Sequence, residues 1–305
     1  MKDQPLVSIV TPTYNMGAFL EETIRSVLSQ DYPRIEYIVM DGGSTDNTLE
    51  ILRRYEGKLL WFSERDEGQA DAVNKGFLRC HGEIFAFLNA DDTYLPGAIA
   101  TAVREFQASP GLAVVYGEAW YTREDGGFLR RYPTDPFDAR RLNSLCFICQ
   151  PASFIRGDVF REVGMLNPKL HLTLDYDLWL RIAKRHRMKK VDAYLATSRM
   201  YAANKTLSRR DDIFREVIQT TRTHCGYVPL NWLYGYAGFV LDGKDGFYDP
   251  SPATIRKALY TLWLGARHNP WKLHRFLGEC LQSVPLAYRL LTGLQKPGEA
   301  NPRGQ

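Results

Sequence analysis

The first 122 residues alternate short apolar runs, rich in β-branched side chains, with stretches of helical periodicity. Short apolar runs of this kind predict strands, and apolar residues spaced three and four apart predict helices. Strands joined in this rhythm by helices form a largely parallel sheet whose faces the helices cover. The expected strands are 7–11, 35–41, 59–64, 84–89 and 112–120, and the expected helical stripes lie within 20–28, 51–55, 70–77 and 99–106.

Composition and charge limit the classes of partner that such a chain can bind. Its 305 residues, 45% of them hydrophobic, suffice for one large domain or for a domain with a smaller appendage. Residues 1–180 carry 18 Lys and Arg against 26 Asp and Glu, a net charge of −8, whereas 181–305 carry 21 against 9, a net charge of +12. We therefore expect cation chemistry in the acidic part and an anionic surface facing the basic part. Because the sequence has neither zinc-finger spacing nor an aromatic RNA-binding signature, a membrane surface or a phosphorylated acceptor is favoured over nucleic acid.

The cysteines and the apolar runs bear on the compartment. Five scattered cysteines favour a reducing compartment over a disulfide framework. Cys146 and Cys149 form a lone C-x-x-C, which we interpret as buried apolar side chains, with a metal or redox pair as the alternative. The sequence starts with polar residues and has no run of about 18 apolar residues. These features predict a cytoplasmic protein, with peripheral contact at the inner face of the membrane as an option for its basic part.

Polar segments follow four of the expected strands. In open parallel sheets, ligands bind outside the carboxyl ends of the strands, so these segments are the candidate binding residues. Each segment taken alone also fits ordinary turn chemistry, and Ser44 in the second is placed to cap the following helix. Their joint position at one sheet edge predicts a polar ligand site there. The segments are 11–15, 41–46, 64–68 and 89–92.

Two adjacent carboxylates, Asp91 and Asp92, follow the apolar strand 84–89. Mg²⁺ and Mn²⁺ prefer a few carboxylate oxygens together with substrate phosphates, so this pair predicts a divalent cation that neutralises a diphosphate. The alternative is that Asp92 only caps the helix beginning near Pro96, which would leave Asp91 without a partner.

Further candidates lie on neighbouring segments. Asp41 ends the second strand before two glycines and is expected to be reachable for hydrogen bonds to a base or a ribose. Tyr14 offers a flat ring for stacking on a base. Asp71 and Lys75 stand four apart on a helix, where they either pair with each other or leave Lys75 for a phosphate.

A third group opens a helix expected after residue 174. Asp175 is stabilised there by the helix dipole, and as an acid outside the cation site it is a candidate general base for an acceptor hydroxyl. Helix capping is the simpler alternative. Asp177 is the second candidate base, and Trp179 is expected in the core, with the acceptor wall as the alternative.

Six sequence segments carry a recognisable pattern. In chain order they are TPTYN at 11–15, VMDGGSTDNT at 39–48, SERDEGQADAVNKGF at 63–77, FLNADDTYLPGA at 87–98, CQPASFIRGDVFREVG at 149–164 and LDYDLWLRIAKRH at 174–186. Together they resemble the family 2 glycosyltransferases of the GT-A fold, over about two thirds of the chain.

The resemblance implies a Rossmann-like three-layer sandwich with a mostly parallel sheet. It implies transfer of a sugar, with inversion, from a nucleoside-diphosphate sugar, a UDP-sugar being favoured. The implied acceptor is a glycan or a lipid-linked acceptor in polysaccharide or glycolipid synthesis.

The resemblance also implies roles for single residues. By the resemblance Pro12, Thr13, Tyr14 and Asp41 hold the nucleoside, Asp91 and Asp92 bind the Mg²⁺ or Mn²⁺ ion and the ribose-diphosphate, and Asp175 is the catalytic base. Asp71, Lys75 and Asn89 are further candidates for the nucleotide-sugar. Gln150, Asp177 and Trp179 are expected on the acceptor side. The domain boundaries are expected to separate a glycosyltransferase domain, 1–206, from a helical extension, 207–305, and within the former a nucleotide-binding half, 1–122, from an acceptor-side half, 123–206.

Two departures from the family pattern bear on the metal. Asn89 stands where many relatives have the first Asp of an Asp-x-Asp motif, and Tyr201 begins a stretch in which many relatives carry a histidine before a Lys-Thr pair, here Lys205 and Thr206. Metal ligation is therefore expected to rest on Asp91, Asp92 and water.

Two other functions compete with sugar transfer. A nucleotidyltransferase shares the fold style and the metal, but it would need a Gly-rich phosphate loop after the first strand, where this chain has TPTYN. A nucleotide-sugar or glycan-binding protein with an inactive site is the non-enzymatic alternative, and the presence of Asp175 argues against it. In the C-terminal third, the segments around Trp271 and Val284 mix basic and apolar residues, which suits amphipathic helices packed on a domain or lying on an anionic bilayer.

Overall fold

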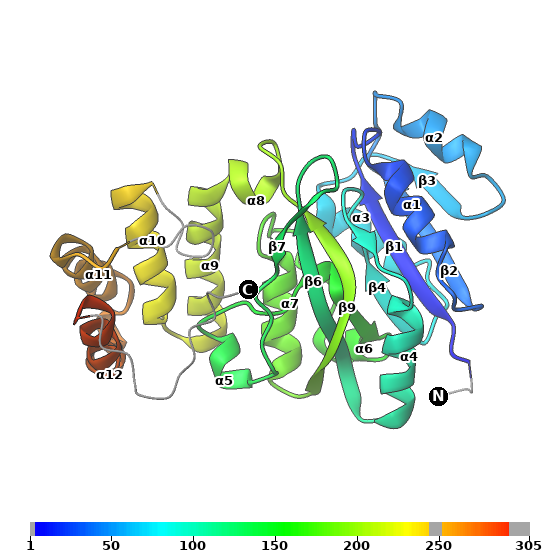
Figure 1. The fold of residues 1–305 in the computed structure, drawn as a ribbon. Coiled ribbons are helices and arrows are strands. Elements are labelled where there is room, and N and C mark those ends of the chain that lie inside the picture. Colours follow the sequence, from blue (N-terminus) through cyan, green and yellow to red (C-terminus); the bar gives the residue numbers. More distant parts are fainter. Residues whose placement is uncertain (1–3, 244–251, 293–305) are drawn as a thin grey trace. The chain divides into compact units, whose positions relative to one another are not determined.

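A computed structural model describes residues 4–243 and 252–292, with side chains up to residue 283. Its centre is a curved sheet of nine strands, in the order β3-β2-β1-β4-β8-β6-β9-β5, with β7 paired to β6 (Figure 1). The strands are β1 (Val7–Thr13), β2 (Ile35–Asp41), β3 (Leu60–Ser63), β4 (Ile84–Phe87), β5 (Thr93–Tyr94), β6 (Leu112–Thr122), β7 (Phe128–Arg131), β8 (Ser153–Arg156) and β9 (Arg187–Arg199).

The N-terminal half of the sheet is parallel. β1 lies between β2 and β4, and β3 pairs with β2, all in parallel. The register sets Thr13 at the end of β1 opposite Asp41 at the end of β2, so the loops that follow these strands leave the sheet side by side. The strands and their parallel pairing agree with the prediction from the alternating pattern.

The other half of the sheet is mixed. β8 runs antiparallel to both β4 and β6, whereas the long strand β9 runs parallel to β6. β5 and β7 are short antiparallel additions. The expected α/β fold is therefore confirmed, with its parallel order concentrated in the half that carries the first four expected strands.

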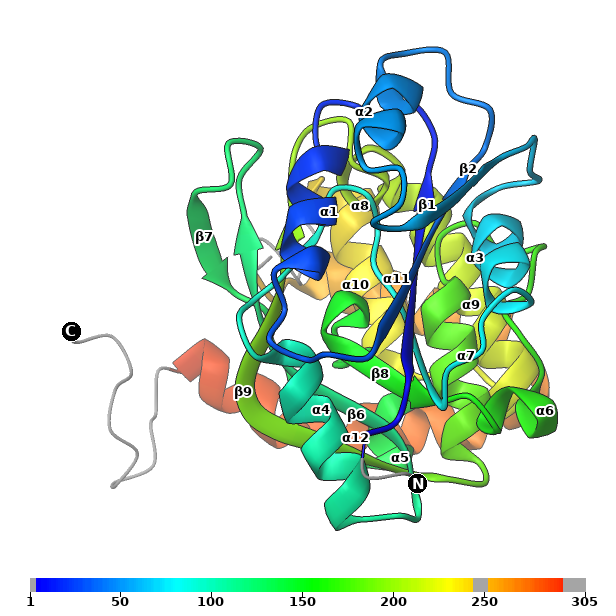
Figure 2. The same cartoon turned by 90° about the vertical axis from the view of Figure 1, so that its right-hand side faces the viewer.

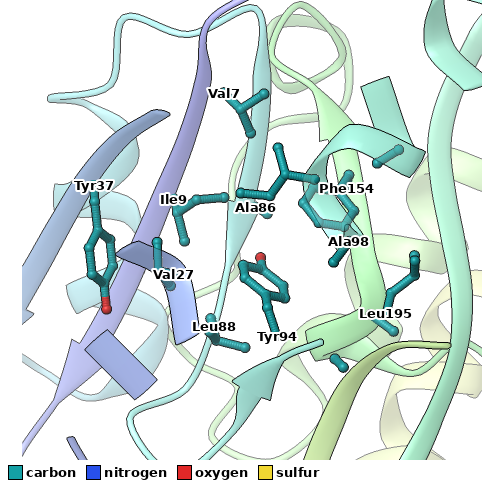
Figure 3. Close-up of a cluster of buried hydrophobic side chains, with 14 of the residues drawn as sticks. Val7, Ile9, Val27, Tyr37, Ala86, Leu88, Tyr94, Ala98, Phe154 and Leu195 are labelled. Carbon is teal, nitrogen blue, oxygen red and sulfur yellow. The ribbon is translucent and has the colours of Figure 1, made fainter. Parts of the chain in front are cut away.

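Helices cover both faces of the sheet, which gives three layers (Figure 2). On one face, alternate residues of β1, β2 and β4 join the apolar stripes of α1, α2 and α4 in a single core, which Figure 3 shows around Ile9, Ala86 and Tyr94. The helices that belong with the sheet are α1 (Leu20–Leu28), α2 (Thr48–Arg54), α3 (Gln69–Phe77), α4 (Ala98–Ala108), α5 (Ala139–Leu142), α6 (Val159–Val163), α7 (Leu174–Ala183), α8 (Lys205–Ser208) and the 3₁₀ turn η1 (Gln150–Ala152).

The opposite face carries α3 and α6. Phe77 of α3 packs against Phe85 of β4 and Phe160 of α6, with ring centroids 5.3 and 4.9 Å apart. Gly76 lets α3 approach the sheet, because a Cβ at this position would lie 2.4 Å from Val10 Cγ1. The close approach fixes the height of the α3 N-terminus above the sheet edge.

The expected cap at Ser44 is wrong. α2 begins after Asn47, whose side chain makes no capping hydrogen bond, and the first N–H of the helix, that of Thr48, is accepted by Asp46 Oδ1 at 3.0 Å. The Ser44 hydroxyl instead donates to Asp41, three residues back, because the carboxylate at the strand end competes successfully for it.

By its contacts the chain divides into two compact units: unit 1 holds residues 1–142 and 146–216, and unit 2 holds 143–145 and 217–305. The division falls inside α9 (Arg210–Cys225). The described part of unit 2 is helical, with α10 (Leu230–Asp242), α11 (Ile255–His268), the 3₁₀ turn η2 (Pro270–Lys272) and α12 (Leu273–Thr292) packed together. None of the described helices is both long and apolar enough to cross a bilayer.

Candidate active site

The loops after β1 and β2 lock together at the sheet edge. Asn15 adopts a left-handed backbone conformation, φ 53°, in which its N–H donates to Ser44 Oγ and its side-chain Oδ1 accepts from the Thr45 N–H, both at 2.8 Å. The Gly17 N–H donates to Asp46 Oδ2 at 2.9 Å. These bonds tie the two expected nucleotide-binding segments into one rigid rim.

The four residues expected at the nucleoside lie on this rim. Pro12 is buried in β1, and the Tyr14 ring is 59% exposed. The Thr13 hydroxyl is buried and has no hydrogen-bond partner among the described residues, which is a costly arrangement unless a ligand supplies one. Asp41 is only 1% exposed, and its oxygens accept from Ser44, Ser63 and the Gly43 N–H. Asp41 is thus less accessible than its place after the strand suggested, because its own loop folds over it.

Asp71 and Lys75 pair with each other. Their Nζ–Oδ2 distance is 3.0 Å, and Lys75 also donates to the Arg65 carbonyl at 2.9 Å. Asp71 accepts from the Glu67 N–H at 3.1 Å. The pair holds the loop between β3 and α3 in place.

The segment after β4 carries the densest polar network. Asn89 is its centre: its amide nitrogen donates to Asp92 Oδ2 at 3.1 Å and to Gln150 Oε1 at 3.3 Å, and its oxygen accepts from Gln69 Nε2 at 2.6 Å. Gln150 in turn donates to the Phe87 carbonyl. Asn89 therefore orients Asp92, a role open to an amide but not to a carboxylate, since only the amide donates.

The two acids of this segment differ in exposure. Asp92 is 4% exposed, and its Oδ1 accepts from the Arg199 N–H at 3.0 Å. Asp91 is half-buried; its Oδ2 accepts from the Tyr201 hydroxyl at 3.1 Å, and its Oδ1 accepts no hydrogen bond from another described residue. The cap proposed for Asp92 is not formed, because α4 begins after Gly97.

The two acids are buried with too little positive charge nearby to keep their pKa values in the usual range. Burial raises the pKa of Asp91, and burial together with the neighbouring Asp91 charge raises the pKa of Asp92 well above its usual value. Arg199 offsets part of this rise, since its positive charge lowers the pKa of both acids and its backbone N–H donates to Asp92. Its side chain is held by Nε, which donates to the Asp91 backbone carbonyl, and by an ion pair with Glu22. A cation beside the two carboxylates would stabilise their charged forms.

Lys205 and Tyr201 join the site from the segment after β9. Lys205 Nζ donates to Gln69 Oε1 at 3.2 Å. Burial and the nearby Arg209 lower the pKa of Lys205, against the opposing charges of Asp91, Asp66 and Glu216. In the sequence this stretch stands out only for its missing histidine, yet it supplies a hydroxyl that donates to Asp91 and a cation on which the Asp91 charge acts.

Asp175 stands in the first turn of α7. It is half-buried, and its Oδ1 accepts from the Tyr176 N–H at 2.8 Å. Burial, reinforced by the charge of Glu216, raises the pKa of Asp175 to about 6, so burial outweighs the helix dipole. Glu216 also accepts from the N–H groups of residues 171–173 and holds the segment that leads into α7. No sequence motif marked Glu216, because it lies 41 residues from the acid that it faces.

The charges of an acid after β4 and of an acid in α7 both act on one buried thiol. Burial raises the pKa of Cys149, and the charges of Asp92 and Asp175 both add to that rise. Of the acceptor-side candidates, Trp179 is fully buried and Asp177 is paired with Arg181 at 2.9 Å, so both side chains lie in the protein interior on the buried face of α7.

A protein-only metal cage is absent from the described residues, since no three His, Cys, Asp or Glu side chains among them gather in metal-binding geometry. The pair Asp91 and Asp92 fits a hard cation that takes its other ligands from a diphosphate and water. Asp91, with an open Oδ1, is better placed for direct ligation than the deeper Asp92.

A three-layer sandwich of this topology, with paired carboxylates after β4, is the architecture of GT-A glycosyltransferases. The sequence profile described as glycosyl transferase family 2 matches residues 8–164, just over half of the chain. The chain therefore belongs to glycosyl transferase family 2.

Relatives and solved structures agree with this membership. An uncharacterised glycosyltransferase of Rickettsia felis is 30% identical over 225 residues, which are 68% of this chain and 36% of the relative. Chondroitin synthase of Escherichia coli is 24% identical over 214 residues, which are 69% of this chain and 31% of that protein. The chain thus spans about a third of the length of these relatives.

Two solved structures share the fold. S. aureus TarS 1–349 in complex with UDP-GlcNAc superposes with a TM-score of 0.61 at 16% identity, covering 94% of this chain and 87% of the other. The mannosyltransferase PcManGT of Pyrobaculum calidifontis, in complex with GDP-Man and Mn²⁺, superposes with a TM-score of 0.57 at 19% identity, covering 96% and 80%. The family membership disfavours the nucleotidyltransferase alternative.

Proposed function

We propose that this protein transfers a sugar from a nucleoside-diphosphate sugar to an acceptor hydroxyl with inversion of the anomeric centre. The observation that carries the proposal is the disposition of its acids. Asp91 and Asp92 share one buried segment after β4, and Asp175 stands apart on α7 with no cation paired to it among the contacts described above. Separate sites for a leaving diphosphate and for a proton acceptor are what a single displacement requires.

Asp175 is the proposed general base. A carboxylate with a pKa near 6 is about 90% ionised at neutral pH, yet it is a stronger base than an ordinary surface carboxylate. Its Oδ1 accepts from the Tyr176 N–H, and Oδ2 is the proposed acceptor of the hydroxyl proton. Attack by that oxygen on the anomeric carbon breaks the bond to the diphosphate in the same step, which inverts the centre.

The nucleotide end is proposed to lie on the rim formed by the loops after β1 and β2. Tyr14 supplies an exposed ring for stacking, and the buried Thr13 hydroxyl supplies an unmatched hydrogen-bonding group. Pro12 and Asp41 shape the rim from beneath, and Asn89, Asp71 and Lys75 hold the segments around it. A uridine donor is favoured, and the UDP-GlcNAc complex of TarS supports that choice.

A bound Mg²⁺ or Mn²⁺ ion would supply charge neutralisation to the departing diphosphate. Asp91 and Asp92 are the proposed ligands, and the Mn²⁺ complex of PcManGT supports the assignment. Tyr201 orients Asp91 through its hydroxyl, and Lys205 adds a second positive charge on the same side.

The acceptor is proposed to be a glycan or a lipid-linked sugar in polysaccharide or glycolipid synthesis, and Gln150 is the remaining polar candidate on that side. The similarity to chondroitin synthase supports a polysaccharide context. A cytoplasmic location and the boundary between a transferase domain and a helical extension at residue 206 remain proposals as well.

The decisive experiment compares Asp175→Asn with Asp177→Asn. Hydrolysis of UDP-sugars uses water in place of the acceptor hydroxyl, and its rate is measured as the release of UDP with Mn²⁺ present. We expect Asp175→Asn to lower kcat by about 10²–10⁴-fold without changing UDP affinity, because only the proton acceptor is lost. Wild-type kcat/KM should rise with pH to a plateau above about pH 6, since the protonated acid is inactive.

Asp177→Asn is the matched control. It should lower the melting temperature, because it breaks the buried pair with Arg181, but keep the pH profile. If Asp177→Asn lost hydrolysis and Asp175→Asn kept it, the general base would be Asp177 and not Asp175. Proton NMR of the first sugar released from an α-linked donor should show the β anomer, and an initial α anomer would contradict inversion.

A further inference from the structure

An ordinary packed helix turns its large apolar side chains toward the interior, whereas α11 of unit 2 exposes most of them. Its inner face presents Lys257, Thr261, Leu264 and Gly265, all buried. Its outer face is a stripe of large apolar side chains, which we call the α11 stripe. The stripe consists of Ile255, Leu259, Leu262 and Trp263, with exposed fractions of 80%, 62%, 40% and 54%.

Contacts within unit 2 fix this orientation. The Lys257 ammonium lies 4.0 Å from the centre of the Tyr234 ring on α10. Gly265 lies under the Phe276 ring of α12, and a Cβ at Gly265 would come within 2.1 Å of it. Rotating the helix to bury the stripe would push a side chain into the Phe276 ring. It would also move Lys257 away from the Tyr234 ring and into solvent, so the apolar face stays outward.

The surroundings of the stripe are basic. From residue 255 to residue 275 the sequence has five Lys and Arg, of which Lys257 is buried on the inner face, and no Asp or Glu. Arg256 and Arg267 flank the stripe on the helix, and the Arg267 guanidinium lies 5.7 Å from the centre of the Trp263 ring. Trp271, in the turn η2 that follows, is 92% exposed.

We propose that the α11 stripe docks on the surface of an anionic lipid bilayer. A helix that lies in the membrane interface places leucine and tryptophan side chains at the acyl boundary and arginines at the lipid phosphates. The absence of acidic residues along this segment favours anionic lipid over a second copy of the chain, which would bring like charge against like charge. The inference is independent of the proposed sugar transfer, since binding to vesicles requires no turnover.

Flotation of the full chain with vesicles tests the proposal. Wild type should float with vesicles of 70% phosphatidylcholine and 30% phosphatidylglycerol, more weakly with pure phosphatidylcholine, and less as salt rises. The double variant Leu259→Gln, Trp263→Gln should reduce the bound fraction at least tenfold. The matched control, Leu60→Gln with Leu78→Gln, removes two equally exposed apolar side chains from unit 1 and should float like wild type.

Three outcomes would overturn the proposal. The first is wild-type chain that stays at the bottom of the gradient with both vesicle types. The second is a stripe variant that floats as well as wild type. The third is a wild-type dimer, seen by sedimentation without vesicles, that the stripe variant dissociates while neither binds lipid, because that result assigns the stripe to a second copy. Unchanged circular dichroism of the variants establishes that they are folded.

Discussion

At the scale of single residues, the site combines buried acids with few cations. Lys205 is the cation whose ammonium reaches the network around Asn89, through Gln69, and it feels the charge of Asp91. Desolvation of its ammonium and the nearby Arg209 lower its pKa, although the residue as a whole is exposed, so an anionic ligand can reach its positive charge from solvent. Tyr201 performs the complementary task of holding Asp91.

We therefore expect Lys205→Met to weaken UDP binding about 10–100-fold, the loss of one hydrogen bond to a charged group. Isothermal titration with UDP and Mn²⁺ measures the change. Lys205→Arg, which keeps the charge, should recover most of the affinity. Equal UDP affinity in Lys205→Met and wild type would remove Lys205 from the diphosphate site.

At the scale of elements, the position of α3 depends on its approach to β1. Gly76 lies against Val10 and Met40, and Val10 is fully buried in the central strand, so neither neighbour has free space to move into. Since α3 carries Gln69 at its start, the packing of this helix sets one end of the hydrogen-bond chain that leads through Asn89 to Asp92.

Gly76→Ala should destabilise unit 1 by about 1–3 kcal/mol, because overpacking outweighs the gain of about 1 kcal/mol in helix propensity. The change in the urea concentration at the midpoint of unfolding measures this destabilisation. Gly111→Ala is the control: a Cβ there meets nothing within 4 Å, so its effect should stay within about 0.5 kcal/mol. A stabilised Gly76→Ala variant would mean that the helix can shift away from the sheet.

At the scale of the whole molecule, the described residues supply an incomplete ligand shell and an unmatched buried hydroxyl at one edge of unit 1. Both features are expected of a site that is completed by its substrate. Nucleotide and cation should therefore bind together rather than singly, because the diphosphate provides ligands that the chain does not.

Thermal unfolding tests this coupling. UDP with Mn²⁺ at about 100 times its Kd should stabilise the protein by about 2.7 kcal/mol, a rise of several degrees in melting temperature. UDP or Mn²⁺ alone should give a smaller shift, and Asp91→Asn should abolish the difference between UDP with and without the ion. A larger response to GDP or dTDP would change the proposed donor, and equal shifts with and without the ion would contradict metal dependence.

The α/β order, the parallel strands and the acids that follow them could all be predicted from the sequence, because strand and helix periodicity and the end of an apolar run are local properties of the chain. The core position of Trp179 and the Asp71–Lys75 pair on one helix turn were predictable for the same reason. Which groups face those acids depends on how distant parts of the chain fold together. Glu216 reaches Asp175, and Tyr201 reaches Asp91, across separations that no periodicity records. The same holds for the burial of Asp41, for the pKa of Asp175, and for the outward turn of α11, since solvation depends on what the rest of the chain packs around a residue.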